Sequence, residues 1–119
     1  MDPAGCTTGA ERCFVCNPEA KSIVGLTALF GSNQFNDQQF HHGYFLYAAG
    51  VLAVDNPARA DQWAPVTNLL VADIATQRDS TYFPERRAFD AYAGHSWASG
   101  TSPFADGKNQ ESSSEAANA

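Results

Sequence analysis

A proline between two helical patterns constrains this chain more than any other feature of its sequence. Over residues 40–54, apolar side chains recur every three or four positions, which is typical of a helix with one apolar face. Pro57 ends that helix, because proline cannot continue a helix and disfavours helical geometry in the residue before it. A second helix is predicted over residues 61–76, with Pro65 in its first turn, where the missing N–H does no harm.

Outside these helices the sequence has no long periodic pattern. Residues 1–22 are predicted to be an irregular lead-in, and residues 77–108, rich in Gly, Ser, Pro and aromatics, a long structured loop. A third helix is predicted to begin near residue 109. The expected fold class is mostly all-α. The apolar positions that define the first two helices are Phe40, Tyr44, Tyr47, Ala48, Val51 and Leu52, and Trp63, Val66, Leu69, Leu70, Ala72 and Ile74, with Trp63 assigned to packing.

An acidic composition limits the classes of partner. With 13 Asp and Glu against 7 Lys and Arg, the formal net charge of −6 leaves no basic patch for nucleic-acid phosphates or for an anionic membrane surface. No run of apolar residues is long enough for a transmembrane helix, and residues 1–5 lack the basic and apolar parts of a signal peptide. No nucleic-acid or membrane partner is therefore expected, and the oligomeric state is left open.

Three cysteines, Cys6, Cys13 and Cys16, lie near the N-terminus. The last two have the CxxC spacing of zinc and redox sites, but zinc needs a second ligand pair and a redox motif needs a βαβ context. A local disulfide or free thiols is the better interpretation. Residues 106–109 resemble a calcium loop only superficially, because the alternating acidic ligands are missing. No metal or other cofactor is expected.

Carboxylates occur in two polar segments that are far apart in the sequence. Glu111 and Glu115 are one helical turn apart, and Asp37 directly precedes the first predicted helix. Each has an ordinary structural interpretation: the Glu pair as a solvated helix face, and Asp37 as an N-cap. Carboxylates that are remote in sequence and face one another across a cleft are also what glycoside hydrolysis requires.

These segments resemble two motifs of glycoside hydrolase family 81, the endo-β-1,3-glucanases, in the same order along the chain. The family's general acid is the aspartate of an Asn-Asp-x-x-Phe-His segment, which implies Asp37 here. Its general base is the first glutamate of an Asn-Gln-Glu-Ser-x-Ser-Glu segment, which implies Glu111. Glu115 matches the second glutamate, whose like charge would raise the pKa values of the pair or orient the attacking water.

The same resemblance implies substrate-binding residues. His41 and Tyr44 belong to the first motif, and Asp90, His95 and Trp97 match a Phe-Asp-x-Tyr-x-Gly-His-Ser-Trp-Ala segment of the family. An indole face against a pyranose ring, with a carboxylate and an imidazole for its hydroxyls, suits a sugar site. A histidine on an apolar helix face and a tryptophan in the core are the alternatives.

This chain also departs from the family's first motif. Gln38 and Gln39 stand where the family usually carries histidines, and His42 stands where it usually carries tyrosine. Glutamine keeps hydrogen-bonding capacity but cannot titrate. The departures therefore leave the implied reaction intact and bear on subsite affinity and on the pH optimum.

The resemblance further implies a fold and an activity. The family's catalytic domain is an (α/α) barrel of six helical hairpins, so residues 23–119 would be a part of it, truncated at both ends. The implied activity is endo-hydrolysis of β-1,3-glucan, such as laminarin or cell-wall glucan, with inversion, by a secreted enzyme. A β-glucan-binding protein and an inactive partial reading frame are the alternatives. By itself the chain is expected to be inactive and poorly soluble, because its apolar helix faces would lack partners.

Overall fold

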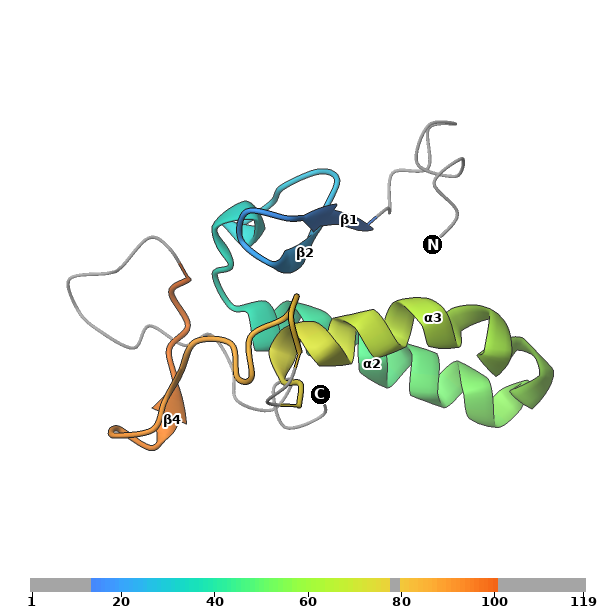
Figure 1. Cartoon of the computed structure of the whole chain (residues 1–119). Coiled ribbons are helices and arrows are strands. Elements are labelled where there is room, and N and C mark those ends of the chain that lie inside the picture. Colours follow the sequence, from blue (N-terminus) through green and yellow to red (C-terminus); the bar gives the residue numbers. More distant parts are fainter. Residues whose placement is uncertain (1–13, 78–79, 101–119) are drawn as a thin grey trace.

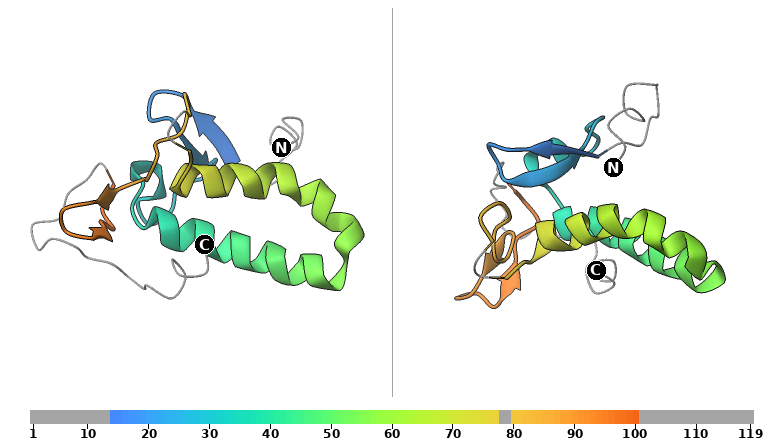
Figure 2. Two further views of the ribbon diagram at one scale, coloured as in Figure 1. Left: turned by 60° about the horizontal axis from the view of Figure 1, so that its bottom comes forward. Right: turned by 45° about the vertical axis from the view of Figure 1, so that its right-hand side comes forward.

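Two long antiparallel helices lie side by side and carry the smaller elements at one end (Figure 1, Figure 2). The computed structural model describes residues 14–77 and 80–100. The two hairpins, β1–β2 and β3–β4, both lie at the end of the helical pair where α2 begins and α3 ends. In chain order the elements are β1 (Phe14–Asn17), β2 (Ser22–Gly25), the 3₁₀ turn η1 (Ser32–Gln34), α2 (Gln38–Asp55), α3 (Pro57–Ile74), β3 (Phe89–Asp90) and β4 (His95–Ser96).

The structure confirms both predicted helices and the break between them. α2 begins at Gln38 and ends at Asp55, close to the predicted residues 40–54. Asn56 separates the helices with a non-helical backbone (φ −142°, ψ 80°). Pro57 then opens α3. The described chain is therefore mostly helical, as the periodicity predicts.

The start of α3 differs from the prediction, because Pro57 itself opens the helix. A proline suits the first helical position, where its N–H would have no partner within the helix and its fixed φ is already helical. Pro65 consequently lies inside α3 and not in its first turn, which corrects the prediction. In a helix interior, proline removes one backbone hydrogen bond and crowds the carbonyl of the preceding turn. Thr67 Oγ1, 3.3 Å and 3.2 Å from the carbonyls of Trp63 and Ala64, donates to backbone acceptors beside this proline.

A β-hairpin replaces part of the irregular lead-in that is expected over residues 1–22. β1 and β2 pair antiparallel, with Asn17 opposite Ser22. The side chain of Asn17 accepts the N–H of Ala20 at 3.1 Å and so shapes the turn between the strands. Strands this short show no clear alternation of apolar and polar residues, which is why the sequence did not reveal them.

The sequence did not predict which helix faces pack together, but it did predict that the apolar faces lack partners in this chain. The seam between the two helices is lined mainly by small residues, which allow two backbones to approach closely. The predicted apolar face of α2 is turned outward, and Tyr44, Tyr47, Val51 and Leu52 are each more than half exposed. Trp63 does line the seam, as predicted. The seam is lined by Leu46, Ala49, Gly50 and Ala53 of α2 and by Ala60, Trp63, Ala64 and Thr67 of α3.

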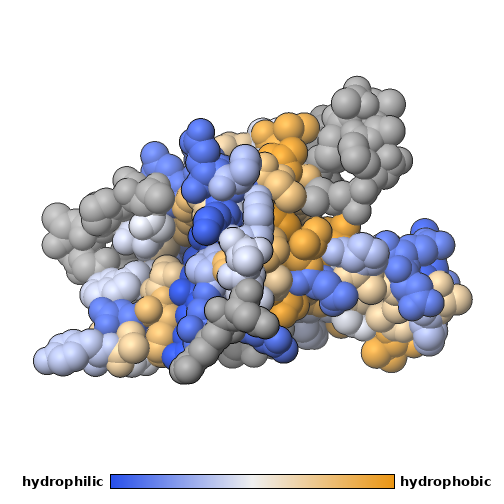
Figure 3. All heavy atoms as spheres, viewed as in Figure 1, coloured by the Kyte–Doolittle hydropathy of each residue, from blue (hydrophilic) through white to orange (hydrophobic). Residues whose placement is uncertain are grey.

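The buried core of the described residues is small. Ile23 of β2 and Leu70 of α3 are almost fully buried, and several polar side chains are buried with them. Apolar residues reach the surface in several places (Figure 3). Of the large aliphatic and phenylalanine side chains that the structure describes, Phe30 and Val54 are the most exposed. Among the described residues, neither helix is long and apolar enough to cross a membrane. Apart from β3 and β4, residues 80–100 are irregular, which fits the predicted loop, and the predicted helix near residue 109 lies outside the described residues.

Candidate active site

Asp37, the predicted general acid, is the N-cap residue of α2 and has a left-handed backbone (φ 49°, ψ 40°). Its N–H donates to the carbonyl of Ala98 at 2.7 Å, and its own carbonyl accepts the N–H of His41 at 2.9 Å. The carboxylate forms no side-chain cap hydrogen bond to α2. Left-handed residues other than glycine are uncommon, and strained backbones cluster at functional sites. The structure thus holds the Asp37 backbone from both directions without using the carboxylate as a helix cap.

His41 and Tyr44 follow Asp37 at four and seven residues along α2, which places the three on one side of the helix. The ring of Phe40 lies between them, 5.7 Å from the His41 ring and 5.0 Å from the Tyr44 ring by centroid. Tyr44 is 54% exposed. The half-buried position of His41 agrees with neither a fully buried core histidine nor a fully solvated one.

A pocket of about 280 Å³ opens beside the first turns of α2, and of these three residues His41 lines it. His41 and Phe45 line it from the helix, Phe14 from β1, and Leu29 and Phe30 from the loop after β2. The walls are largely apolar, with imidazole and amide groups at the helix start. Such a pocket can hold the apolar face of a ring while polar groups at one end bind hydroxyls.

Asp90, His95 and Trp97, the predicted sugar-binding residues of the Phe-Asp-x-Tyr-x-Gly-His-Ser-Trp-Ala segment, form one cluster at the β3–β4 hairpin. Trp97 Nε1 donates to Asp90 Oδ2 at 3.2 Å, and the His95 and Trp97 rings meet edge to face at 4.8 Å. Asp90 Oδ1 accepts the backbone N–H groups of Tyr92 (2.8 Å) and Ala93 (2.9 Å). The hydrogen bond from Ala93, followed by that from Trp97, lowers the pKa of Asp90, so its carboxylate stays ionised. Both oxygens of Asp90 therefore already accept hydrogen bonds, Oδ1 from the backbone and Oδ2 from the indole of Trp97.

Backbone hydrogen bonds fasten this hairpin to the start of α2. Directly after Trp97, the carbonyl of Ala98 accepts the N–H of Asp37. Nearby, Gly100 N–H donates to the side chain of Asn36 at 3.2 Å. The structure therefore fastens to each other the two segments, far apart in the sequence, that carry the six predicted site residues it describes.

The remaining predicted residues lie outside the described part of the chain. They are Glu111 and Glu115, the predicted base and its neighbour. Cys6 and Cys13 also lie outside the described residues. Cys16 is exposed and carries a free thiol. Within residues 14–77 and 80–100, no group of three or more His, Cys, Asp or Glu side chains is arranged to hold a metal ion.

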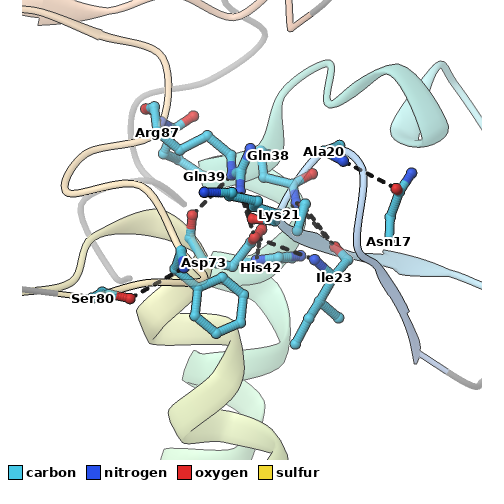
Figure 4. Close-up of polar contacts among 12 residues, drawn as sticks. Asn17, Ala20, Lys21, Ile23, Gln38, Gln39, His42, Asp73, Ser80 and Arg87 are labelled. Atoms are coloured by element: carbon cyan, nitrogen blue, oxygen red, sulfur yellow. Dashed lines mark hydrogen bonds and ion pairs between the residues drawn. The ribbon is translucent and has the colours of Figure 1, made fainter.

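A buried polar network behind the start of α2 was missed in the sequence (Figure 4). At its centre is Asp73 of α3, which is fully buried. Asp73 Oδ1 accepts Arg87 at 2.8 Å and the N–H of Ile23 at 3.2 Å, and Oδ2 accepts the side-chain amide of Gln38. His42 Nδ1 lies 3.6 Å from Oδ2. One signal was present: Asp73 is the single charged residue within the apolar end of the second helix, from Leu70 to Ile74.

The two glutamines that depart from the family motif belong to this network. Gln38 Nε2 lies 3.1 Å from the carbonyl of Ile23 and 3.3 Å from Ser22 Oγ, and Gln39 Nε2 donates to the carbonyl of Arg87 at 2.8 Å. Both glutamines are buried. Their contacts are with the protein framework, so any effect on subsite affinity would be indirect.

His42 makes stability depend on pH. Burial lowers its pKa below 6.5, although the nearby Asp73 carboxylate opposes this shift. As pH falls below about 6.5, His42 binds a proton in the unfolded chain before it does so in the folded protein. The free energy of unfolding therefore decreases, by at most about 1.4 kcal/mol per pH unit. We expect the thermal unfolding midpoint to fall between pH 7.5 and 5.5, and His42→Gln to reduce that fall. His95→Gln, at a half-buried site, is the matched control, and an unchanged pH dependence in His42→Gln would contradict the assignment.

Comparison with known proteins gives a consistent picture. The model of the glycosyl hydrolase family 81 C-terminal domain matches residues 18–119. A glucan endo-1,3-beta-D-glucosidase of Acetivibrio thermocellus is 51% identical over 102 residues, which are 82% of this chain and 13% of that protein. One of Thermobifida fusca is 42% identical over 91% of this chain and 15% of its own length. A primary septum glucan endo-1,3-beta-D-glucosidase of Schizosaccharomyces pombe is 40% identical over 79% of this chain and 10% of its own length. The chain thus spans about a seventh of the length of the first two relatives.

Proposed function

Because this chain belongs to glycosyl hydrolase family 81, we propose that it contributes catalytic residues to the endo-hydrolysis of β-1,3-glucan. The relatives' names supply the substrate and the reaction. In this proposal Asp37 is the general acid that protonates the leaving oxygen. Glu111 is the general base that activates water on the opposite face of the sugar, and Glu115 tunes or orients that base. The anomeric configuration is then inverted, since no covalent intermediate forms.

The observation that carries the proposal is the hydrogen bond from Asp37 N–H to the Ala98 carbonyl, 2.7 Å long. It joins the proposed acid to the hairpin with the indole and imidazole that suit a sugar ring. A general acid must lie within hydrogen-bond reach of the leaving oxygen, so a sugar held on that hairpin must be in a fixed relation to Asp37. His41 and Tyr44, on the same side of α2, would add hydroxyl and ring contacts to a neighbouring glucosyl unit.

The proposal extends to the surroundings of the site. We assign α2 and α3 to one hairpin of a six-hairpin (α/α) barrel, in which the outward apolar side chains of α2, such as Tyr47 and Leu52, would meet further helices. The whole enzyme would act outside the cell, because its substrate is a polymer of the cell wall or of storage glucan. No metal takes part, since acid and base chemistry needs only the carboxylates.

One experiment tests the reaction and its stereochemistry together. In a chimera, residues 18–119 of this chain replace the matching segment of the Acetivibrio thermocellus relative. Proton NMR of laminarin hydrolysis by the chimera should show the α-anomer first, with the β-anomer appearing only by mutarotation. An initial β-anomer would exclude inversion. Absence of hydrolysis by a folded chimera, where the unaltered relative is active, would refute the proposed activity.

A further inference from the structure

The buried network around Asp73 joins four segments of the chain at one point (Figure 4). Asp73 belongs to the end of α3, Ile23 to β2, Gln38 to the first turn of α2, and Arg87 to the loop before β3. Each of the last three donates to the Asp73 carboxylate. Arg87 also donates from Nε to the backbone carbonyl of Asp73 at 2.9 Å and from a terminal nitrogen to that of Lys21 at 2.7 Å.

Burying such a network in a protein core costs desolvation free energy. A buried carboxylate and guanidinium lose their hydration, and a well-packed apolar group of similar volume is often as stable or more so. What Arg87 adds is directional contact, because its planar guanidinium donates from a terminal nitrogen to Asp73 Oδ1 and from Nε to the Asp73 backbone carbonyl. The network therefore serves to orient the chain segments that it holds.

The network holds two segments that flank Asp37, the proposed acid. Gln38 directly follows Asp37 in the chain, and its amide is held by Asp73 and Ile23. On the other side, Arg87 precedes Ala88, whose carbonyl accepts the N–H of Trp97 at 2.9 Å. The next residue after Trp97 supplies the carbonyl that accepts the Asp37 N–H. The Asp73–Arg87 pair therefore anchors both segments that hold the Asp37 backbone.

We infer that Asp73 is a positioning residue, which acts through Gln38 and Arg87 to set the direction of the Asp37 carboxyl toward the leaving oxygen. This inference rests on the proposed function, in which Asp37 is the general acid. Asp73 itself is fully buried in the protein interior and is not proposed to touch the glucan. Misplacement of a catalytic group by about 1 Å can cost on the order of 100-fold in rate, so small changes in this network should be visible in turnover.

Asp73→Asn in the chimera tests the inference, because the side chain keeps its shape and loses its charge and one acceptor. Two substrates separate positioning from general damage: laminarin, whose leaving oxygen must be protonated, and laminaribiosyl β-fluoride, whose leaving group needs little protonation. We expect kcat to fall roughly 10- to 100-fold on laminarin and less than about 3-fold on the fluoride. Asp55→Asn, an exposed aspartate at the far end of α2, is the matched control and should change neither rate.

Two further variants keep the test decisive. Arg87→Lys retains the positive charge but cannot donate to the carboxylate and the backbone carbonyl of Asp73 at once. It should lose more kcat on laminarin than on the fluoride, as Asp73→Asn does. Adding Asp73→Asn to Asp37→Ala should cause no further loss on laminarin, since the acid being positioned is already gone. Equal losses of kcat on both substrates in Asp73→Asn and Arg87→Lys would overturn this inference but not the proposed function. Additive losses in the double variant would do the same. An unsubstituted chimera that is inactive on both substrates would overturn the proposed function as well.

Discussion

Asp37→Ala in the chimera is expected to reduce laminarin turnover by roughly 10²- to 10⁴-fold, because the glucan leaving oxygen would depart without a proton. The loss should shrink as the leaving group improves, and it should be small on laminaribiosyl β-fluoride. Comparing kcat on the two substrates measures the acid's contribution directly. Binding should change less, since the hydrogen bond that Asp37 makes to Ala98 comes from its backbone and survives the substitution.

Asp61→Ala is the matched control for this variant. Asp61 is an exposed aspartate in the first half of α3, whereas the hairpins lie where α3 ends. Its removal should leave both rates unchanged. A similar loss on laminarin and on the fluoride in Asp37→Ala would argue against the acid role. Near-normal laminarin hydrolysis in that variant would exclude it.

Glu111→Ala is also expected to reduce kcat on laminarin by roughly 10²- to 10⁴-fold, because no base would remain to activate the attacking water. The shortened side chain leaves room on the water side of the sugar. Inversion needs only a nucleophile there, so added azide should restore part of the turnover and give a glycosyl azide of inverted configuration. Mass spectrometry and proton NMR of the product would identify the azide and its anomeric configuration.

Glu115→Gln provides the comparison for Glu111→Gln. If Glu115 only tunes the base, its substitution should cost less than that of Glu111, and azide should not alter the rate. Near-normal activity of Glu111→Ala without azide would end this assignment. A larger loss in Glu115→Gln than in Glu111→Gln would exchange the roles of the two glutamates.

The tertiary structure adds an explanation for the two glutamines that set this chain apart from the family's usual motif. Gln38 and Gln39 are buried, and their amides bond to framework groups of β2, α3 and the loop at Arg87. An amide donates to these acceptors at any pH, because it does not titrate. In this region the pH sensitivity of folding is therefore expected to come from His42.

Local sequence by itself determined the two helices and the break between them. The apolar periodicity and the fixed φ of Pro57 act within a few residues, so they can be interpreted without knowing what lies nearby. The candidate residues Asp37, His41, Tyr44, Asp90, His95 and Trp97 were likewise found by motif, before their positions in space were known. The start of α3 was missed because Pro57 could equally end one helix and open the next.

Only the tertiary structure decided which helix faces meet and what holds Asp37. The apolar periodicity of α2 did not show which residues face α3, and the structure places mainly small residues in the seam between the two helices. The contacts of Asp73 with Ile23, Gln38 and Arg87 join positions that are 50, 35 and 14 residues apart. No local pattern encodes such contacts, because burial of a charge depends on partners that the folded chain brings together.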